Sequence, residues 1–213
     1  MIDVRPYDAD ADLVATAAAG EARLRVARPA ATFVVLGAGS HPDVELHLGA
    51  VREDRVPVFR RPGGGCAVVL DPGNVVVSVA APARAVPGIR SAFERISAWL
   101  IAALAECGVP GIEMAGVSDL ALGDRKVAGA AIQRGRDALY YSASILVDPR
   151  LESIERYLRH PPREPEYRRG RRHRDFLRPL SAVNRSWTAE TFRAILDSRL
   201  QLRRLSVEAR LAP

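Results

Sequence analysis

The chain has 213 residues, 48% of them hydrophobic, which predicts a single domain over residues 1–213 with one sizeable core. Its formal net charge of +6 favours anionic partners, such as phosphates, nucleic acids or acidic proteins. No run approaches the roughly 20 apolar residues that span a bilayer, and the start lacks the regions of a signal peptide, so we expect a cytoplasmic protein without a membrane partner. The two cysteines and four histidines lack metal-ligand spacing, so no metal site is expected.

The first third of the chain is predicted to alternate helices with short strands. An alanine-rich run with Asp at its start and Arg toward its end predicts a helix over 8–26. The β-branched run 32–36 predicts a strand that ends at Gly37, and a second helix is expected over 43–53. Apolar runs between Pro/Gly segments predict three more strands, at 56–60, 67–70 and 75–80.

The rest of the chain adds one long helix, a second group of strands and two later helices. Apolar residues recur every three to four positions over 88–107, which predicts an amphipathic helix. Further strands are expected at 119–122, 127–133 and 139–147, and further helices at 151–158 and 188–204. Because the strands come in clusters, with helices between the clusters, the pattern predicts an α+β fold of mixed or antiparallel sheets flanked by helices.

A glycine-rich segment, RRPGGGCAVVLDPGN, lies between two of the predicted strands at residues 60–74. Three consecutive glycines let the backbone approach a ligand closely and direct successive N–H groups at an anion. The preceding Arg60 and Arg61 could add a guanidinium to such a site. The segment lacks the Gly-Lys-Ser/Thr of a Walker A loop, so by itself it is equally compatible with a flexible hairpin connection.

The only lysine of the chain, Lys126, stands in a second notable segment, DLALGDRKVAGAA, at residues 119–131. The other 30 basic residues are arginine, so a lysine here points to a role that a compact ammonium fills and a planar guanidinium does not. Small residues after Lys126 leave room beside the backbone for an extended ligand. Asp119 lies on the preceding strand, although alternation alone does not fix which face of the sheet each side chain uses.

Together the two segments resemble the lipoate-protein ligase A family, within the wider group of biotin and lipoate ligases and octanoyltransferases. The first family motif is matched by Arg60, Arg61, Gly64, Gly65, Ala67, Val68, Asp71, Gly73 and Asn74, and the second by Asp119, Leu120, Gly123, Lys126, Val127, Gly129 and Ala131. The resemblance extends from about Val34 to Leu180 and includes GRRHRDFL at residues 170–177.

The resemblance implies a lipoate-protein ligase that forms lipoyl-AMP from lipoate and ATP and transfers the lipoyl group to a lysine of a lipoyl domain. Lys126 would be the catalytic residue and would bridge the acyl carbonyl and the phosphate. The implied adenylate-binding residues are Arg61, Gly64, Gly65, Cys66, Ala67, Val68, Val69, Asn74, Asp119, Lys126, Gly129 and Ala131. Mg²⁺ would take part where ATP is used, because it bridges the phosphates.

Two departures from the family pattern affect substrate and partner. The family usually carries His-Gly after the lysine strand, where this chain reads Tyr140 to Ser144, which alters one wall of the expected site. The chain also leaves no room after the match for the accessory C-terminal domain that many lipoate ligases use for adenylation. The resemblance therefore implies either an accessory protein for that step or a preformed adenylate.

Three alternative readings stay open on the sequence. A cysteine-dependent octanoyl or lipoyl transferase of the same fold would need a nucleophile, yet neither Cys66 nor Cys107 lies where that family places it. The arginine-dense segment 161–179 is predicted to be a surface loop or arm. It would suit a non-catalytic nucleic-acid binder, although nucleic acid is the less favoured partner, or it would steer an acidic acceptor protein to the site. A degenerate ligase would bind lipoate or a lipoylated protein without turnover.

Overall fold

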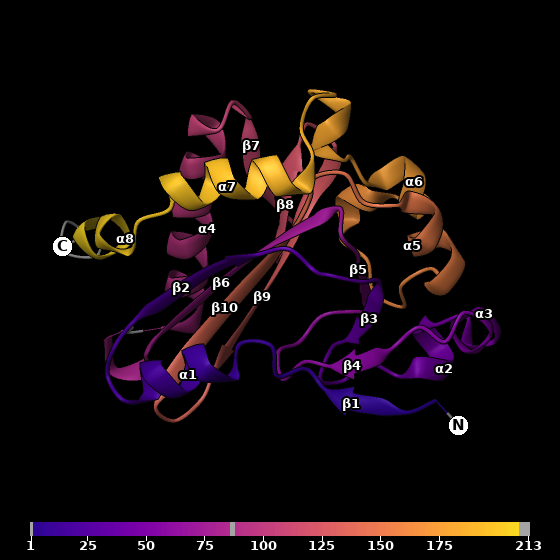
Figure 1. Cartoon of the computed structure of the whole chain (residues 1–213), viewed down its shortest axis with the longest axis horizontal. Coiled ribbons are helices and arrows are strands. Elements are labelled where there is room, and N and C mark those ends of the chain that lie inside the picture. The colour runs from indigo at the N-terminus through magenta and orange to yellow at the C-terminus, as the bar shows by residue number, and fades with distance from the viewer. Residues whose placement is uncertain (1, 86–87, 209–213) are drawn as a thin grey trace.

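A computed structural model of the chain describes residues 2–85 and 88–208, and its strands form two sheets (Figure 1). The larger sheet is antiparallel throughout, in the order β2 (Arg23–Ala27), β6 (Asn74–Pro82), β10 (Ala138–Leu146), β9 (Arg125–Arg134), β8 (Asp119–Leu122), β7 (Ile112–Ala115). The smaller sheet is mixed, in the order β1 (Val4–Pro6), β4 (Val58–Arg60), β3 (Phe33–Leu36), β5 (Val68–Leu70). The α+β class with mixed and antiparallel sheets is confirmed.

One face of the six-stranded sheet is covered by two helices, α4 (Ile89–Glu106) and α7 (Ala189–Arg199). The apolar residues of α4 recur every three to four positions, so one stripe of the helix is buried against the sheet. Leu139, Tyr141 and Ala143 of β10 point into this core, and their neighbours Tyr140, Ser142 and Ser144 lie on the opposite face. That opposite face faces the smaller sheet.

The smaller sheet packs with several short helices and builds a second core. These helices are α2 (Pro42–Glu45), α3 (Leu48–Glu53), α5 (Leu151–Tyr157) and α6 (His173–Phe176). Figure 1 shows α2 and α3 beside the smaller sheet and α5 and α6 together above them. The short helix α1 (Ala11–Ala18) covers the end of the larger sheet, where Leu13 and Ala17 pack on Ala80 and Ala138.

The prediction of a helix over 8–26 is wrong for the second half of that range. Helix α1 ends at Ala18, Gly20 takes a φ of 109°, and the chain reverses into strand β2. Arg25 of β2 then pairs with Asp10 and Asp12 at the start of α1, at 2.9 and 2.6 Å. The arginines that suggested a helix C-terminus therefore belong to a strand. Pairing of this strand with β6 outweighs the local helix propensity of the sequence.

Two other predicted helices are each divided in two. The helix predicted over 43–53 breaks at Leu46, which is extended and forms a β-bridge with Leu158. The C-terminal helix predicted over 188–204 consists of α7 and α8 (Leu202–Glu208), separated at the buried, extended Leu200. In both places a fully or almost fully buried leucine contributes more by packing than by continuing the helix.

Some strands lie outside the predicted set or beyond its limits. The edge strands β1 and β7 were not predicted, because three or four residues carry too little alternation to be recognised. Strand β9 begins at Arg125 and not at residue 127, so Lys126 lies within a strand. The long helix at 88–107 and the other predicted strands are confirmed to within two residues at each end.

Candidate functional site

Lys126 lies at an irregularity in strand β9. Asp119 pairs with Gly129 and Leu120 with Ala128, but the next residue of β8, Ala121, pairs with Lys126, so Val127 is an extra residue in the ladder. A β-bulge of this kind puts two successive side chains on one face, and Val127 and Ala128 are both fully buried in the core. As a result Lys126 shares the opposite face with Gly129.

The ammonium of Lys126 is held by a buried carboxylate. Lys126 Nζ lies 2.7 Å from Asp119 Oδ1, and the hydroxyl of Tyr167 donates to Asp119 Oδ2 at 2.9 Å. Burial, and then the negative charge of Asp119, raises the pKa of Tyr167 above its usual range, so the hydroxyl stays protonated as a donor. Asp119, and through it Tyr167 from 48 residues further along the chain, thus fix the position of the Lys126 ammonium.

Small residues surround this cation along strands β9 and β10. A Cβ on Gly129 would lie 2.9 Å from Lys126 Nζ and 3.0 Å from its Cε, so the glycine makes room for the lysine side chain. On the same face Ser144 lies opposite Gly129, and Ser142 lies opposite Ala131. The predicted pair Gly129 and Ala131 is therefore brought onto the face that carries Lys126.

The glycine-rich loop lies against this row of small residues. A Cβ on Gly63 would lie 3.5 Å from the Cβ of Ala131, in ordinary contact, so the loop passes directly over β9. Gly64 and Gly65 are exposed, and within residues 2–85 and 88–208 no acceptor is found for the backbone N–H groups of residues 63–66. Unused amides of this kind can bind an anion.

Arg60 and Arg61 hold the loops of the site in place. Arg60 Nη1 donates to the carbonyls of Gly37, Ala38 and Ser40 at 2.8–3.1 Å. Arg61 donates to Gly64 O through Nη2 at 2.7 Å and to Cys66 O at 3.0 Å, and burial lowers the pKa of its guanidinium. Arg60 thus fixes the segment Gly37–Ser40, and Arg61 fixes the glycine-rich loop, both through backbone carbonyls.

The next three residues of the motif lead from the loop into strand β5. Cys66 is partly exposed, and its Sγ lies 3.6 Å from Arg163 O. The amide of Ala67 donates to the buried carboxylate of Glu45 at 2.6 Å. Val68 and Val69 lie on β5 and pack into two different hydrophobic cores, so their side chains anchor the strand that carries the loop.

The last part of the first motif forms a buried turn between β5 and β6. Asn74 is 1% exposed, and its Oδ1 accepts from the amide of Asp71 at 2.9 Å. Asp71 in turn accepts from the amides of Gly73 and Arg150. A Cβ on Gly73 would lie 1.9 Å from Asp148 O, so the turn packs directly against the end of β10. Asn74 is therefore built into the fold, whereas the glycine-rich loop, which Arg61 holds, lies against Ala131 on the sheet face that carries Lys126.

Two parts of the site were not identified in the sequence. The segment Gly37–Ser40 supports the glycine-rich loop, because Ala38 N donates to Gly63 O at 2.9 Å and a Cβ on Gly37 would lie 1.9 Å from Gly65 O. Tyr167 reaches Asp119 from within the arginine-dense segment. The Gly-Ala-Gly-Ser after strand β3 was a usable signal for the first, whereas nothing local distinguishes Tyr167 from a surface tyrosine.

A second buried carboxylate lies on the same sheet face, under helix α1. Asp10 Oδ2 accepts from Ser78 and from Tyr140, both at 2.6 Å, and its other oxygen pairs with Arg25. Burial raises the pKa of Tyr140, and the charge of Asp10 raises it further. Tyr140, the first residue of the segment that replaces His-Gly, is thus committed to an internal network.

Part of the arginine-dense segment 161–179 is packed into the fold. Arg168 is 4% exposed and lies 4.9 Å from the ring centroid of Phe176, which Arg171 also contacts at 5.5 Å. Arg171 pairs with Asp124 at 2.8 Å. Cation–π contacts and ion pairs within the fold therefore engage some of the arginines that the sequence suggested for binding a nucleic acid.

The second cysteine is remote from this chemistry. Cys107 closes helix α4 and is buried in the large core, where desolvation raises the pKa of its thiol. A buried thiol of this kind is a packing residue. Across the described residues, no helix is long and apolar enough to cross a membrane.

Comparisons with known proteins point to one family. Residues 7–201 match the family described as the lipoyl protein ligase A/B catalytic domain. A lipoate-protein ligase of Streptococcus pyogenes is 33% identical over 126 residues, which cover 59% of this chain and 36% of that protein. The chain thus spans well under half the length of this curated relative.

Two solved structures share the fold. One, from Thermoplasma acidophilum, is described as a bipartite lipoate protein ligase with its E2 lipoyl domain, and it superposes with a TM-score of 0.73 at 20% identity over 93% of this chain and 80% of that chain. Another, a lipoate-protein ligase A bound with ATP, gives 0.73 at 20% identity over 93% of this chain and 82% of that chain. Because the family match runs over nearly the whole chain and the fold agrees, the chain belongs to the lipoyl protein ligase A/B catalytic domain family.

Proposed function

We propose that this protein is a lipoate-protein ligase, which binds lipoyl-AMP and transfers the lipoyl group to a lysine of a lipoyl domain. The observation that carries the proposal is the position of Lys126. Its ammonium lies on the face that the glycine-rich loop covers, and it is held there by Asp119 over Gly129. A single fixed cation beside unused backbone amides suits a mixed anhydride, whose carbonyl and phosphate both carry negative charge in the reaction.

In the transfer step, the acceptor amine attacks the acyl carbonyl of lipoyl-AMP. A carbon–nitrogen bond forms, the bond between the acyl carbon and the phosphate oxygen breaks, AMP leaves with the electron pair, and the amine releases a proton to solvent. An ammonium about 4 Å from a phosphate gains on the order of 4 kcal/mol at an intermediate dielectric. Lys126 would stabilise both the carbonyl oxygen and the leaving phosphate in this way.

The glycine-rich loop is the proposed binding site for the phosphate of lipoyl-AMP. Its exposed Gly64 and Gly65 carry the unused N–H groups, and Arg61 holds the loop by donating to the carbonyls of Gly64 and Cys66. The small side chain of Ala131 lets the loop approach β9 closely, and Gly129 leaves the room that the Lys126 side chain fills beside it. In this proposal Arg61 acts as a positioning residue, through the loop it holds, while the amides contact the adenylate.

Lipoate and ATP are the proposed substrates of the adenylation step, in which the lipoate carboxylate attacks the α-phosphorus and pyrophosphate leaves. No group of three His, Cys, Asp or Glu side chains in the described residues could hold a metal ion, and Asp119 is engaged by Lys126 and Tyr167. Mg²⁺ would accompany ATP in this step and neutralise charge on its phosphates.

A second polypeptide is the proposed partner for adenylation. The support for it is the neighbour from Thermoplasma acidophilum, which is described as bipartite. We place the reaction in the cytoplasm, where ATP and apo-proteins are available. The acceptor is a lipoyl domain, the kind of protein named with that same neighbour.

The test is transfer to a purified apo-lipoyl domain, read by intact mass, with either lipoate plus ATP/Mg²⁺ or preformed lipoyl-AMP. We expect transfer from lipoyl-AMP by the wild type, loss of transfer in Lys126→Arg, and retained transfer in Cys66→Ala. Loss confined to Cys66→Ala would identify a thiol transferase. Binding of lipoate without transfer from either donor would identify a binding protein and overturn the proposal.

A further inference from the structure

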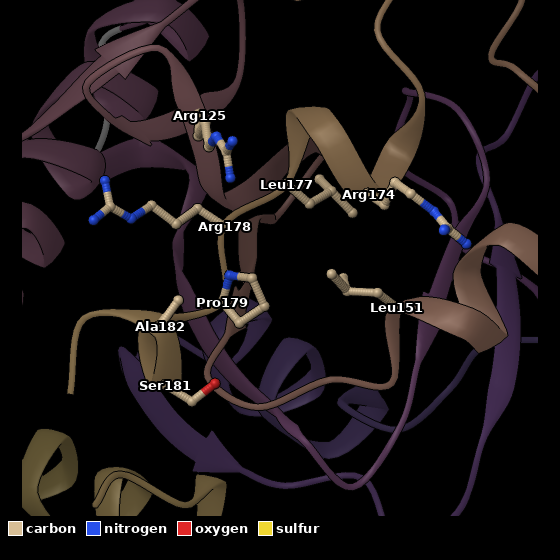
Figure 2. A pocket seen from close by; sticks show the side chains of 8 residues that line it. All are labelled: Arg125, Leu151, Arg174, Leu177, Arg178, Pro179, Ser181 and Ala182. Atoms are coloured by element: carbon tan, nitrogen blue, oxygen red, sulfur yellow. The ribbon is translucent and has the colours of Figure 1, made fainter. Parts of the chain in front are cut away.

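A pocket of about 630 Å³ lies next to the segment that carries Lys126 and is separate from the site described above. Figure 2 shows its eight lining side chains, with Arg125 and Arg178 on one side of Leu177 and Arg174 on the other. Leu151, at the start of α5, closes the far side. The pocket thus has a partly apolar surface bordered by three arginines.

The charge of this pocket is largely unneutralised. None of its lining residues is acidic, and within the described chain neither Arg125 nor Arg178 has a carboxylate partner. Arg174 has only Glu155, with 3.8 Å between Nε and the carboxylate oxygen. Arg168 and Arg171 of the same segment are instead packed and paired. The fold therefore uses some of these arginines internally and leaves three around the pocket.

The pocket is tied to the proposed catalytic lysine through the backbone. Arg125 immediately precedes Lys126 on β9, and the amide of Arg178 donates to Lys126 O at 2.8 Å. Leu177 forms a parallel β-bridge with Lys126. Because Arg125 is the first residue of β9, the pocket lies at the end of the strand that carries Lys126, where we expect an acceptor whose lysine approaches Lys126 to come within reach of these arginines.

We propose that this pocket binds acidic side chains that flank the target lysine on the acceptor protein, an inference that rests on the proposed function. The three guanidiniums supply the charge complement, and Leu151, Leu177 and Pro179 offer apolar contact to the same surface. No aromatic side chain lines the pocket for base stacking, which favours an acidic protein over a nucleic acid. Charges placed this way raise the association rate and fix orientation more than they raise final affinity.

The experiment measures acceptor dependence of transfer from preformed lipoyl-AMP, with a purified apo-lipoyl domain from the same organism. Arg125→Glu/Arg178→Glu is compared with wild type and with Arg136→Glu, an exposed arginine in the turn between β9 and β10. We expect the double variant to raise the KM for the acceptor by about tenfold or more, with a smaller effect as salt is increased. The kcat at saturating acceptor and the Tm of the double variant should stay close to wild type. The kinetics of Arg136→Glu should also match those of wild type.

Direct binding of the apo-domain to each variant provides a readout that does not depend on turnover. Equal acceptor KM and equal binding in wild type and the double variant would overturn the inference and leave the ligase proposal standing. A defect only with lipoate, ATP and an accessory protein, with normal transfer from lipoyl-AMP, would assign the pocket to the accessory protein and also overturn it. Wild type that neither transfers to nor binds the domain would reject both proposals.

Discussion

The ammonium of Lys126 occupies the space where a side chain of Gly129 would begin. A Cβ on Gly129 would lie 2.9 Å from Lys126 Nζ, and the Nζ is in turn 2.7 Å from Asp119 Oδ1. This relationship exists because of the bulge at Val127, which turns Lys126 onto the face of Gly129. It makes the glycine a determinant of where the only ammonium side chain of this protein sits.

Substitution of Gly129 by alanine should therefore impair chemistry without unfolding the protein. We expect transfer from lipoyl-AMP to fall by about ten- to a hundredfold, since a shift of roughly 1 Å in a catalytic group can cost that much. The Tm should change little, because Gly129 has no positive φ. Gly49→Ala is the control, since nothing lies within 4 Å of a Cβ there. Unchanged transfer in Gly129→Ala would show that Lys126 need not occupy its present position.

Tyr167→Phe should weaken the support of Asp119 while leaving the lysine in place. The variant removes the 2.9 Å hydrogen bond to Asp119 Oδ2, and a hydrogen bond to a charged group contributes roughly 1.5–3 kcal/mol. We expect lower stability in urea unfolding and a several-fold lower kcat, with the KM for lipoyl-AMP changed less. A defect in KM alone would argue that Tyr167 contacts ligand and does not act through Asp119.

Asn74→Ala is predicted to be a stability variant, although Asn74 belongs to the first motif. Its Oδ1 accepts from Asp71 N and its Nδ2 lies 3.5 Å from Ile145 O, with almost no exposure to solvent. Leaving these buried groups without partners costs about 1–3 kcal/mol each. Thermal unfolding should show a clear fall in Tm, while the folded fraction keeps its transfer rate. The opposite pattern, normal Tm with lost transfer, would place Asn74 in contact with the adenylate.

Protonation of His173 should limit stability in acid. Burial, and then the charge of Arg168, lowers the pKa of His173 from 6.5 to about 4. Because the folded state holds the neutral ring, its stability is complete above pH 6.5 and falls as the pH drops from 6.5 to 4. The loss should approach about 3 kcal/mol at the low end of that window.

His173→Gln is the matched variant for this test, since its side chain does not titrate. Urea unfolding at a series of pH values should give a flatter profile for the variant between pH 6.5 and 4 than for wild type. Lys126, Arg168, Glu155 and His160 all act on the ring electrostatically, and they are unchanged in both proteins. Parallel profiles would mean that other groups, and not His173, control the acid transition.

The sequence alone predicted the residues of the candidate site and determined the general class of the fold. Lys126 stands out because it is the single lysine among arginines, and the three glycines before β5 stand out because no other residue allows such close backbone approach. Helix α4 and the central strands were predicted from the periodicity of apolar residues, because residues that share a buried face recur at the period of the helix or strand. These features are local, and local patterns can be recognised in a single amino-acid sequence.

Tertiary structure decided which faces meet and which charges are used. Alternation would have put Lys126 and Gly129 on opposite faces, and only pairing with β8 creates the bulge that brings them together. Tyr167 reaches Asp119 across 48 residues, and Asn74 is buried by strands that follow it far along the chain. Likewise the fold, and not the sequence, separates the packed Arg168 and Arg171 from Arg125 and Arg178. Contacts between distant segments set burial, and burial decides whether a polar residue supports the fold or remains available to a partner.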